Sequence, residues 1–152
     1  MKKIALTLLL TSGLTMAYAQ EVKEANVPEA VKAALTKMYP DAKNAEWEME
    51  EGNYEAEIDV NKVETSVVFT PTGEHIMTEV EISKDALPAA VHGYVATNLG
   101  GKKIKEAAKM TTAAGVVTYE AEVDGADYIF DANGNYLSKE VEDKDDDDKK
   151  SK

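Results

Sequence analysis

The sequence predicts an α+β fold of two tandem repeats, each with one helix followed by a four-stranded antiparallel meander sheet. The first observation is repetition, because residues 27–31 (VPEAV) return at 87–91 as LPAAV, and 54–58 (YEAEI) return at 119–123 as YEAEV. The second is a regular alternation of apolar and charged residues between turn signals. One such block cannot bury its apolar face alone, so the two are expected to stack or share a sheet. Whether the two sheets fuse is left open.

The first repeat, residues 27–82, is expected to begin with a helix after Pro28, because apolar residues recur there at helical spacing up to Met38. Alternation with a period of two then predicts a meander of strands. These strands are expected at about 45–50, 54–60, 63–70 and 76–82. Turns at Gly52 and Gly73 separate the members of two hairpins.

The second repeat, residues 83–142, starts a helix at Pro88 that is expected to stop at Gly100. Asp124–Gly125 and Asn133–Gly134 are tight-turn signals between the strands that follow. Those strands are expected at about 102–112, 116–124, 126–131 and 135–142.

The two ends of the chain have their own patterns. Residues 1–19 combine two lysines, an apolar run and small residues, which is typical of a secretory signal peptide cleaved after Ala19. Residues 20–26 are expected to form an N-terminal linker. Residues 143–152 hold only charged residues and a serine, which predicts a disordered tail. The mature protein is therefore expected to be periplasmic or secreted, without a membrane anchor.

Composition limits the chemistry. The chain has no cysteine, which removes disulfides and thiolate metal sites. Its formal net charge is −12, and every one of its 17 basic residues is lysine. The absence of arginine removes the planar fork that phosphate recognition favours, so nucleic acid is not an expected partner. No cofactor or metal site is predicted.

The carboxylates on the strands do not form a predicted catalytic site. They alternate with apolar residues and are interpreted as a solvated face: Glu46, Glu48, Glu50, Glu55, Glu57 and Asp59. The chain has two histidines, His75 and His92, on different elements, so a nucleophile, base and orienting group are hard to assemble. The protein is therefore predicted not to be an enzyme.

One turn resembles a calcium loop. Asp131, Asn133, Asn135 and Glu142 stand at positions one, three, five and twelve of such a loop. The glycine comes at position four instead of six, and the flanks read as strands. A hairpin turn explains these residues better, and calcium stays a minor alternative.

Five residues interrupt the polar outer face of the predicted sheets with apolar or amphipathic groups. They are Val68, His75, Met77, Ile129 and Tyr136. Apolar groups surrounded by charge are typical of a recognition patch, although scattered exposed apolar residues are also ordinary. These five residues form the candidate binding site.

The ordered motifs of both repeats carry a family resemblance. The first repeat has Val27–Pro28, Tyr39–Pro40 and Trp47, and the second has Leu87–Pro88 and the run 129–134, IFDANG. With these motifs the chain resembles the PepSY-like, beta-lactamase-inhibitor-like family of exported bacterial proteins over residues 27–142. The resemblance implies tandem units of helix and sheet, with no catalytic residues and no cofactor. Fold by itself is a poor guide to function.

Two functions follow as hypotheses. The first is an exported, non-enzymatic protein-binding module that inhibits or modulates an exported enzyme through the five-residue patch. The alternative is an acidic cation-binding or envelope-stress protein of the periplasm. The identity of the partner and the oligomeric state are left open.

Overall fold

The computed structural model describes residues 20–141. The predicted signal peptide with its cleavage after Ala19, and the predicted tail 143–152, lie outside the described residues. In chain order the elements are β1 (Gln20–Glu21), η1 (Glu24–Asn26), α1 (Glu29–Met38), β2 (Glu46–Glu50), β3 (Asn53–Val60), β4 (Val63–Phe69), β5 (His75–Glu81), η2 (Lys84–Ala86), α2 (Ala89–Asn98), β6 (Ile104–Thr112), β7 (Val117–Val123), β8 (Ala126–Asp131) and β9 (Tyr136–Val141). The helices and the main strands lie within two residues of their predicted positions.

The strands form one sheet. Over residues 20–141, nine antiparallel strands pair in chain order from β1 to β9. The predicted fold class, two repeats each with a helix and its own four-stranded sheet, is therefore wrong: the structure is mostly one nine-stranded sheet with two α-helices in the described chain. The join is the ladder between β5 and β6, where Met77 faces Thr112. Alternating side chains identify strands, but pairing is decided by backbone edges that leave no trace in the pattern.

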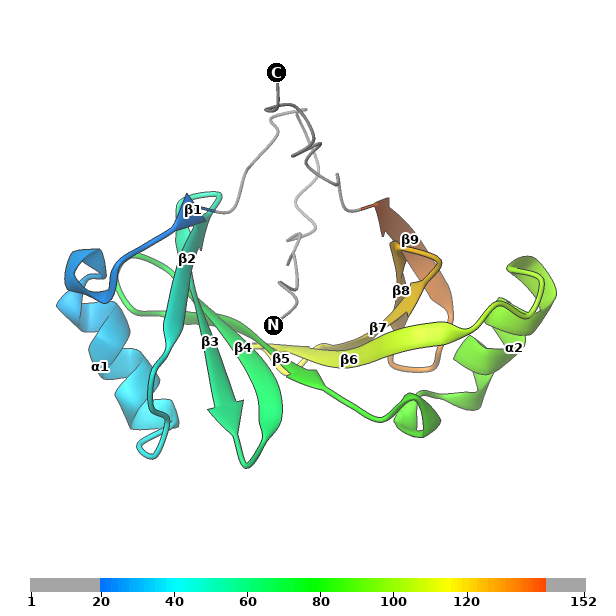
Figure 1. The fold of residues 1–152 in the computed structure, drawn as a ribbon, viewed down its shortest axis with the longest axis horizontal. Helices are drawn as coiled ribbons and strands as arrows, with labels where there is room; N and C mark the ends of the chain where they lie inside the picture. Colours follow the sequence, from blue (N-terminus) through cyan, green and yellow to red (C-terminus); the bar gives the residue numbers. More distant parts are fainter. Residues whose placement is uncertain (1–19, 142–152) are drawn as a thin grey trace, which may run out of the picture.

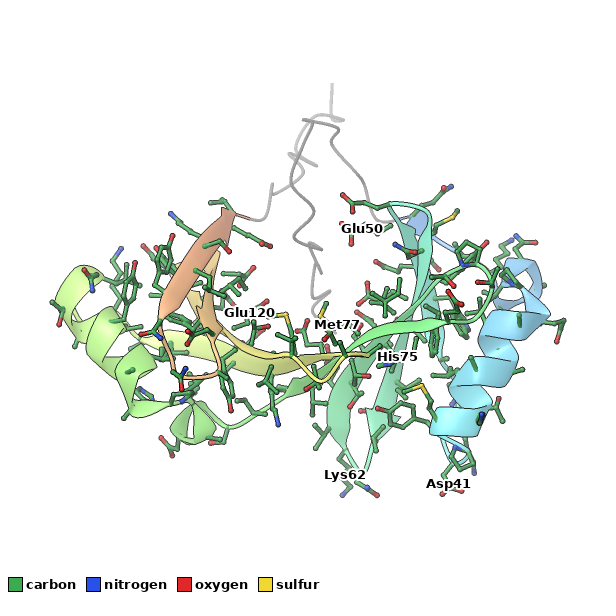
Figure 2. The ribbon with its side chains drawn as sticks, turned by 180° about the vertical axis from the view of Figure 1, so that it is seen from behind. Asp41, Glu50, Lys62, His75, Met77 and Glu120 are labelled. Carbon is green, nitrogen blue, oxygen red and sulfur yellow. The ribbon has the colours of Figure 1, made fainter. Side chains whose placement is uncertain are left out.

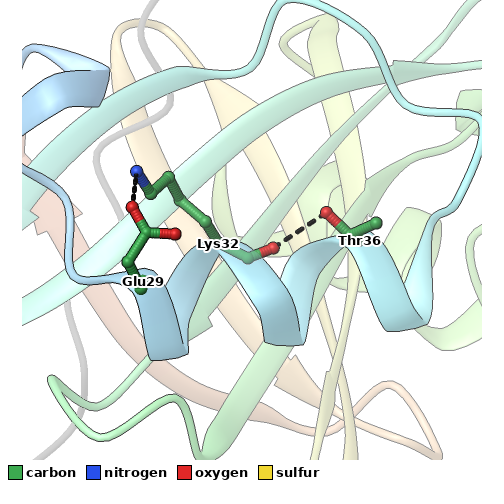
Figure 3. Close-up of polar contacts among 3 residues, drawn as sticks. All are labelled: Glu29, Lys32 and Thr36. Carbon is green, nitrogen blue, oxygen red and sulfur yellow. Dashed lines mark hydrogen bonds and ion pairs between the residues drawn. The ribbon is translucent and has the colours of Figure 1, made fainter.

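Local sequence sets the limits of helix α1. Pro28 precedes the helix with an extended backbone, where its missing N–H does no harm. On the helix surface, the Lys32 ammonium lies 2.6 Å from the Glu29 carboxylate, and the Thr36 hydroxyl donates to the Lys32 carbonyl at 2.9 Å (Figure 3). These contacts are exposed, so they contribute less to stability than the buried face of the helix.

The sheet is curved, and both helices lie against its outer, convex side near its two ends (Figure 1). Under α1, Val31 and Leu35 pack with Trp47, Val67 and Phe69 from the strands. A second cluster of the same kind lies under α2. Its buried members are Leu87, Val91, Ala107, Ala121 and Phe130. The concave side carries no helix among residues 20–141.

Two glycine turns hold the sheet against its helices. Gly73, in the turn from β4 to β5, has a φ of +82°, and a Cβ there would lie 2.5 Å from the Ala30 carbonyl oxygen on α1. Gly134, in the turn from β8 to β9, approaches α2 in a similar way, with a Cβ position 2.9 Å from the Ala90 Cβ. Glycine is required at these turns for both backbone conformation and space.

Candidate binding surface on the concave face of the sheet

An apolar cluster lies in the middle of the concave face. Its buried members are Val68 on β4, Met77 on β5, Met110 on β6 and Ile129 on β8, and Ile76 packs beside them. Side chains alternate between the two faces of a strand. Val67 and Phe69, on either side of Val68 in β4, belong to the core under α1. Val68 therefore points to the opposite, concave side. Figure 2 shows Met77 on this side.

The cluster members are 5–6 % exposed, so they make a closely packed floor. Val68 faces Met77 directly in the β4–β5 ladder. Contact between directly opposed side chains on antiparallel strands stabilises the sheet. We call Val68, Met77, Met110 and Ile129 the apolar floor. It brings together residues from four strands that span the join between the two halves of the sheet.

The five predicted site residues divide into two groups. Val68, Met77 and Ile129 meet in the apolar floor. His75 lies apart, because its imidazole Nε2 is 2.9 Å from the Thr78 hydroxyl and its ring lies edge-on to Phe69 of the α1 core. Tyr136 also lies apart and stacks on Tyr94 of α2, with ring centroids 4.9 Å apart. The binding role of all five stays a prediction.

Irregular ladders explain this division. The register shifts between Val68 and Phe69, and again between Ile129 and Phe130, as a β-bulge does. Each shift leaves one extra residue on the second strand, Ile76 on β5 and Leu137 on β9. This turns His75 and Tyr136 to the helix side, opposite Phe69 and Phe130. A strict period of two therefore assigns His75 and Tyr136 to the wrong face.

Met110 is a floor residue that the sequence pattern missed. Strict alternation places it on the inner face with Ile104, but the β6–β7 register shifts between Ile104 and Ala107. Ala107 then enters the α2 core, and Met110 turns to the concave side. A bulge has no reliable single-sequence signal, so this residue could be placed only by the structure.

Carboxylates surround the apolar floor, and several of them are buried. Figure 2 shows Glu50 and Glu120 on the same side of the sheet as Met77. The buried acids that the described residues contain are Glu48, Glu55, Glu79 and Asp127. The interpretation of Glu48 and Glu55 as part of a solvated face is therefore wrong. Alternation places these carboxylates on the correct side of the sheet. Their burial depends on the curvature of the sheet, which a strand pattern does not specify.

Burial changes the acidity of the carboxyls at one end of this face. Glu55 is 4 % exposed and accepts a hydrogen bond from the Ser66 hydroxyl. Burial raises the pKa of Glu55 to about 7, although that hydrogen bond acts in the opposite direction. Burial also raises the pKa of Glu50 to about 7, with further contributions from Glu51, Glu48 and Glu140. Glu140 lies on β9 and Glu50 on β2, so a charge near one edge of the curved sheet raises the pKa of a carboxyl near the other edge.

Glu79 lies deepest in this acidic group. It is 1 % exposed and lies on β5, the central strand of the nine. Neither of its carboxyl oxygens has a hydrogen-bond partner in the structure of residues 20–141. Burial raises its pKa well above the usual value, and Glu55 and Asp127 add to the effect. A buried, unpartnered carboxyl of this kind is rare and is typical of a functional site.

In the calcium-like turn, the Asp131 carboxylate accepts hydrogen bonds from the turn itself. Asp131 Oδ1 accepts hydrogen bonds from the backbone N–H groups of Asn133 and Asn135, at 2.8 and 2.9 Å. Its Oδ2 accepts one from the Asn135 side chain at 2.8 Å. These bonds lower the pKa of Asp131. The arrangement favours a hairpin turn, and the described part of the chain has no group of three His, Cys, Asp or Glu residues that could hold a metal ion.

The sequence matches the model of a known protein family. The family described as "putative beta-lactamase-inhibitor-like, PepSY-like" matches residues 14–64 and 54–138. No protein with a curated description matches the chain. None of the helices that the structure describes is long and apolar enough to cross a membrane.

Solved structures from Bacteroides have a similar fold. A "putative periplasmic" protein of Bacteroides eggerthii DSM 20697 is 25% identical, with a TM-score of 0.68 over 75% of this chain and 88% of that chain. A DUF2874 family protein of Bacteroides uniformis ATCC 8492 is 24% identical, with a TM-score of 0.63 over 74% and 87%. A "BLIP-like" protein of Bacteroides fragilis NCTC 9343 is 24% identical, with a TM-score of 0.59 over 79% and 90%.

Proposed function

The chain belongs to the PepSY-like, beta-lactamase-inhibitor-like family, and from that premise we propose that it is an exported, non-enzymatic module that binds another protein on the concave face of its sheet. The observation that carries this proposal is the apolar floor of Val68, Met77, Met110 and Ile129 on the face without a helix in the described chain. An apolar centre within a charged rim is the usual anatomy of a protein–protein interface.

The chemistry of the floor supports binding. Two of its members are methionines, whose flexible and polarisable side chains adapt to different partner surfaces. The buried acids around it would fix the orientation of a partner more than they would add affinity. A concave surface also favours a protruding partner segment over a flat one, because a protruding segment can reach the floor.

The family name and one neighbour suggest the kind of partner. The Bacteroides fragilis structure is described as that of a BLIP-like protein, and the family is described as beta-lactamase-inhibitor-like. We infer that the present chain inhibits or modulates an exported enzyme. Export is supported by the secretory pattern of residues 1–19 and by the periplasmic description of the Bacteroides eggerthii protein. We place the mature chain in the periplasm or outside the cell.

Affinity capture tests the proposal. The bait is the chain from Gln20 onward, which contains every described element, and the source is an envelope extract of the native host. We expect Met77→Glu/Met110→Glu to lose a captured partner, while Val63→Glu/Val141→Glu, exposed at 36 % and 62 % on other strands, retains it. Circular dichroism verifies folding, and Met77→Gln/Met110→Gln replaces the charged pair if that pair does not fold. Equal capture by the floor and control variants would overturn the proposal.

A second candidate function is low-affinity cation binding by the acidic face. The buried acids Glu55, Glu79 and Asp127 lie on one side of the sheet and make its potential negative, which favours diffuse attraction of cations without a shared set of ligands. Calorimetric titration with calcium separates the two candidates. The protein-binding module predicts no saturable heat, whereas a cation buffer predicts saturable heat that disappears when these carboxylates are replaced by amides.

A further inference from the structure

The unpartnered Glu79 carboxyl indicates what the concave face binds. Both oxygens of this side chain are buried, and neither meets a donor in the structure of residues 20–141. Its ladder neighbours are Ser66 on β4 and Met110 on β6. The Ser66 hydroxyl donates to Glu55 and is therefore not available to Glu79. A buried polar group without a partner costs free energy in the isolated protein, so the missing donor is expected to come from a ligand.

The surroundings of Glu79 select the class of donor. Residues 20–141 hold no group of three His, Cys, Asp or Glu residues with the geometry of a metal site, which argues against a bound metal ion. Met110 lies directly opposite Glu79, and Met77 is on the same face two residues earlier in β5. A ligand that reaches the carboxyl must therefore pass along thioether and methylene groups. Lysine and arginine have this character, with a long aliphatic stem and a cationic head.

We propose that the concave face takes a lysine or arginine side chain from a basic, amphipathic segment of the partner protein, with the cationic head on Glu79 and Glu55 and the stem on Met77 and Met110. This inference rests on the proposed function and names the chemistry of the partner. Charge complementarity supports it, because the chain has a net charge of −12. Apolar residues beside the partner cation would cover Val68 and Ile129.

Proton release accompanies such binding. The charged groups that act on Glu79 are Glu55 and Glu57 from β3, Glu64 from β4 and Asp127 from β8, and all of them favour its protonated form, as burial does. A cation on the carboxyl favours the ionised form instead. Binding therefore drives a proton from Glu79 into solvent, and the affinity for a basic segment rises with pH around neutrality.

Calorimetry with designed peptides tests the inference on the chain from Gln20. The probe is an eight-residue peptide that alternates lysine and leucine, and the control peptide carries glutamate in place of lysine. Glu79→Gln and Glu74→Gln make the same carboxyl-to-amide replacement, but Glu74 is exposed in the turn before β5, so the pair separates the site from general attraction. Glu79→Gln is expected to fold, because it replaces a buried carboxyl that is held in its protonated form with a neutral amide of nearly the same size and shape.

We expect the lysine peptide to bind, and Glu79→Gln to weaken it by about tenfold or more, as loss of one member of a desolvated charge pair does. Glu74→Gln is expected to change the affinity by less than about twofold, as rim charges do. Titrations in two buffers of different ionisation enthalpy should show proton release with the intact chain and less release with Glu79→Gln. No binding, equal weakening by both variants, or tighter binding of the glutamate peptide would overturn the inference.

Four other results would distinguish this inference from its alternatives and from the proposed function. Saturable calcium heat that Glu79→Gln abolishes would overturn the inference in favour of a metal ion. A dimer that Glu79→Gln dissociates would overturn it in favour of a second copy of the chain. A captured partner that Met77→Glu/Met110→Glu loses but Glu79→Gln and Glu55→Gln retain would overturn the inference alone. A partner that all these variants retain would overturn the proposed function as well.

Discussion

Glu79 lies directly opposite Ser66 in the β4–β5 ladder, yet the Ser66 hydroxyl donates its hydrogen bond to Glu55 on β3, the strand that flanks β4 on its other edge. Of these two buried carboxyls, Glu55 has the Ser66 donor, and Glu79 is left without a donor among the described residues. This relationship gives the concave face its chemistry, because it leaves a buried acceptor beside the apolar floor. It also makes the stability of the isolated protein depend on pH.

Stability is expected to fall as pH rises from about 5 to about 8. Burial raises the pKa of Glu55 to about 7 in the folded protein, so the native state holds its proton at pH values where the unfolded chain has lost it. The contribution of Glu55 is greatest below its unfolded pKa and is lost as pH rises through the folded value, with a change of at most about 3 kcal/mol. Urea unfolding at pH 5, 6, 7 and 8 measures it.

Glu55→Gln and Glu79→Gln should each flatten that pH dependence, since the amide does not titrate. The amide oxygen introduced by Glu55→Gln could still accept the Ser66 hydroxyl, so this variant isolates the loss of charge. The matched control is Glu74→Gln, at an exposed turn position, which should leave the slope unchanged. A slope that both buried variants retain would show that other groups cause the pH dependence.

Gly73→Ala is expected to destabilise the fold by about 2–4 kcal/mol. The new Cβ would lie 2.5 Å from the Ala30 carbonyl oxygen, in addition to the strain of a φ of +82°. Gly52→Ala is the control, because its φ is +81° and nothing lies within 4 Å of the added Cβ. It should cost about 1 kcal/mol from backbone strain alone. Equal losses in urea unfolding would mean that the turn does not press against α1.

Tyr136→Ala should lower the free energy of unfolding by about 1 kcal/mol through loss of its stack on Tyr94. The two rings are nearly parallel, at 7°, with centroids 4.9 Å apart. Tyr136→Phe keeps the ring and should cost little. A double-mutant cycle with Tyr94→Ala isolates the ring contact, and a coupling energy near zero would show that the stack is not stabilising.

Periodicity in the sequence predicted the individual elements and missed how they combine. The strand from Val117 to Val123 and the helix from Ala89 to Asn98 lie where alternation, Pro88 and the paired glycines put them. The union of β5 with β6 into one sheet could not be read from the same pattern, because side-chain alternation is independent of which backbone edges pair.

Most of the apolar floor could be predicted from alternation, because Val68, Met77 and Ile129 lie on the face that a period of two assigns to them. Register shifts limit the prediction elsewhere. Met110 and Tyr136 lie beyond or beside such shifts, which reverse the expected face.

The burial of Glu79 could not be predicted, because it depends on sheet curvature and on neighbours from other strands. A glutamate between Thr78 and Val80 on an alternating strand otherwise reads as an ordinary solvated residue. Its missing hydrogen-bond donor is likewise a property of the folded sheet, since Ser66, opposite Glu79 in the β4–β5 ladder, donates to Glu55.

The most direct test of the central claim is capture of a partner from host envelope extract by three forms of the chain from Gln20. These are the unaltered chain, Met77→Glu/Met110→Glu on the concave floor, and Val63→Glu/Val141→Glu away from it. We predict a partner that the unaltered and control forms capture and the floor variant loses while its circular dichroism remains native. A partner captured equally by the folded floor variant would contradict binding on the concave face.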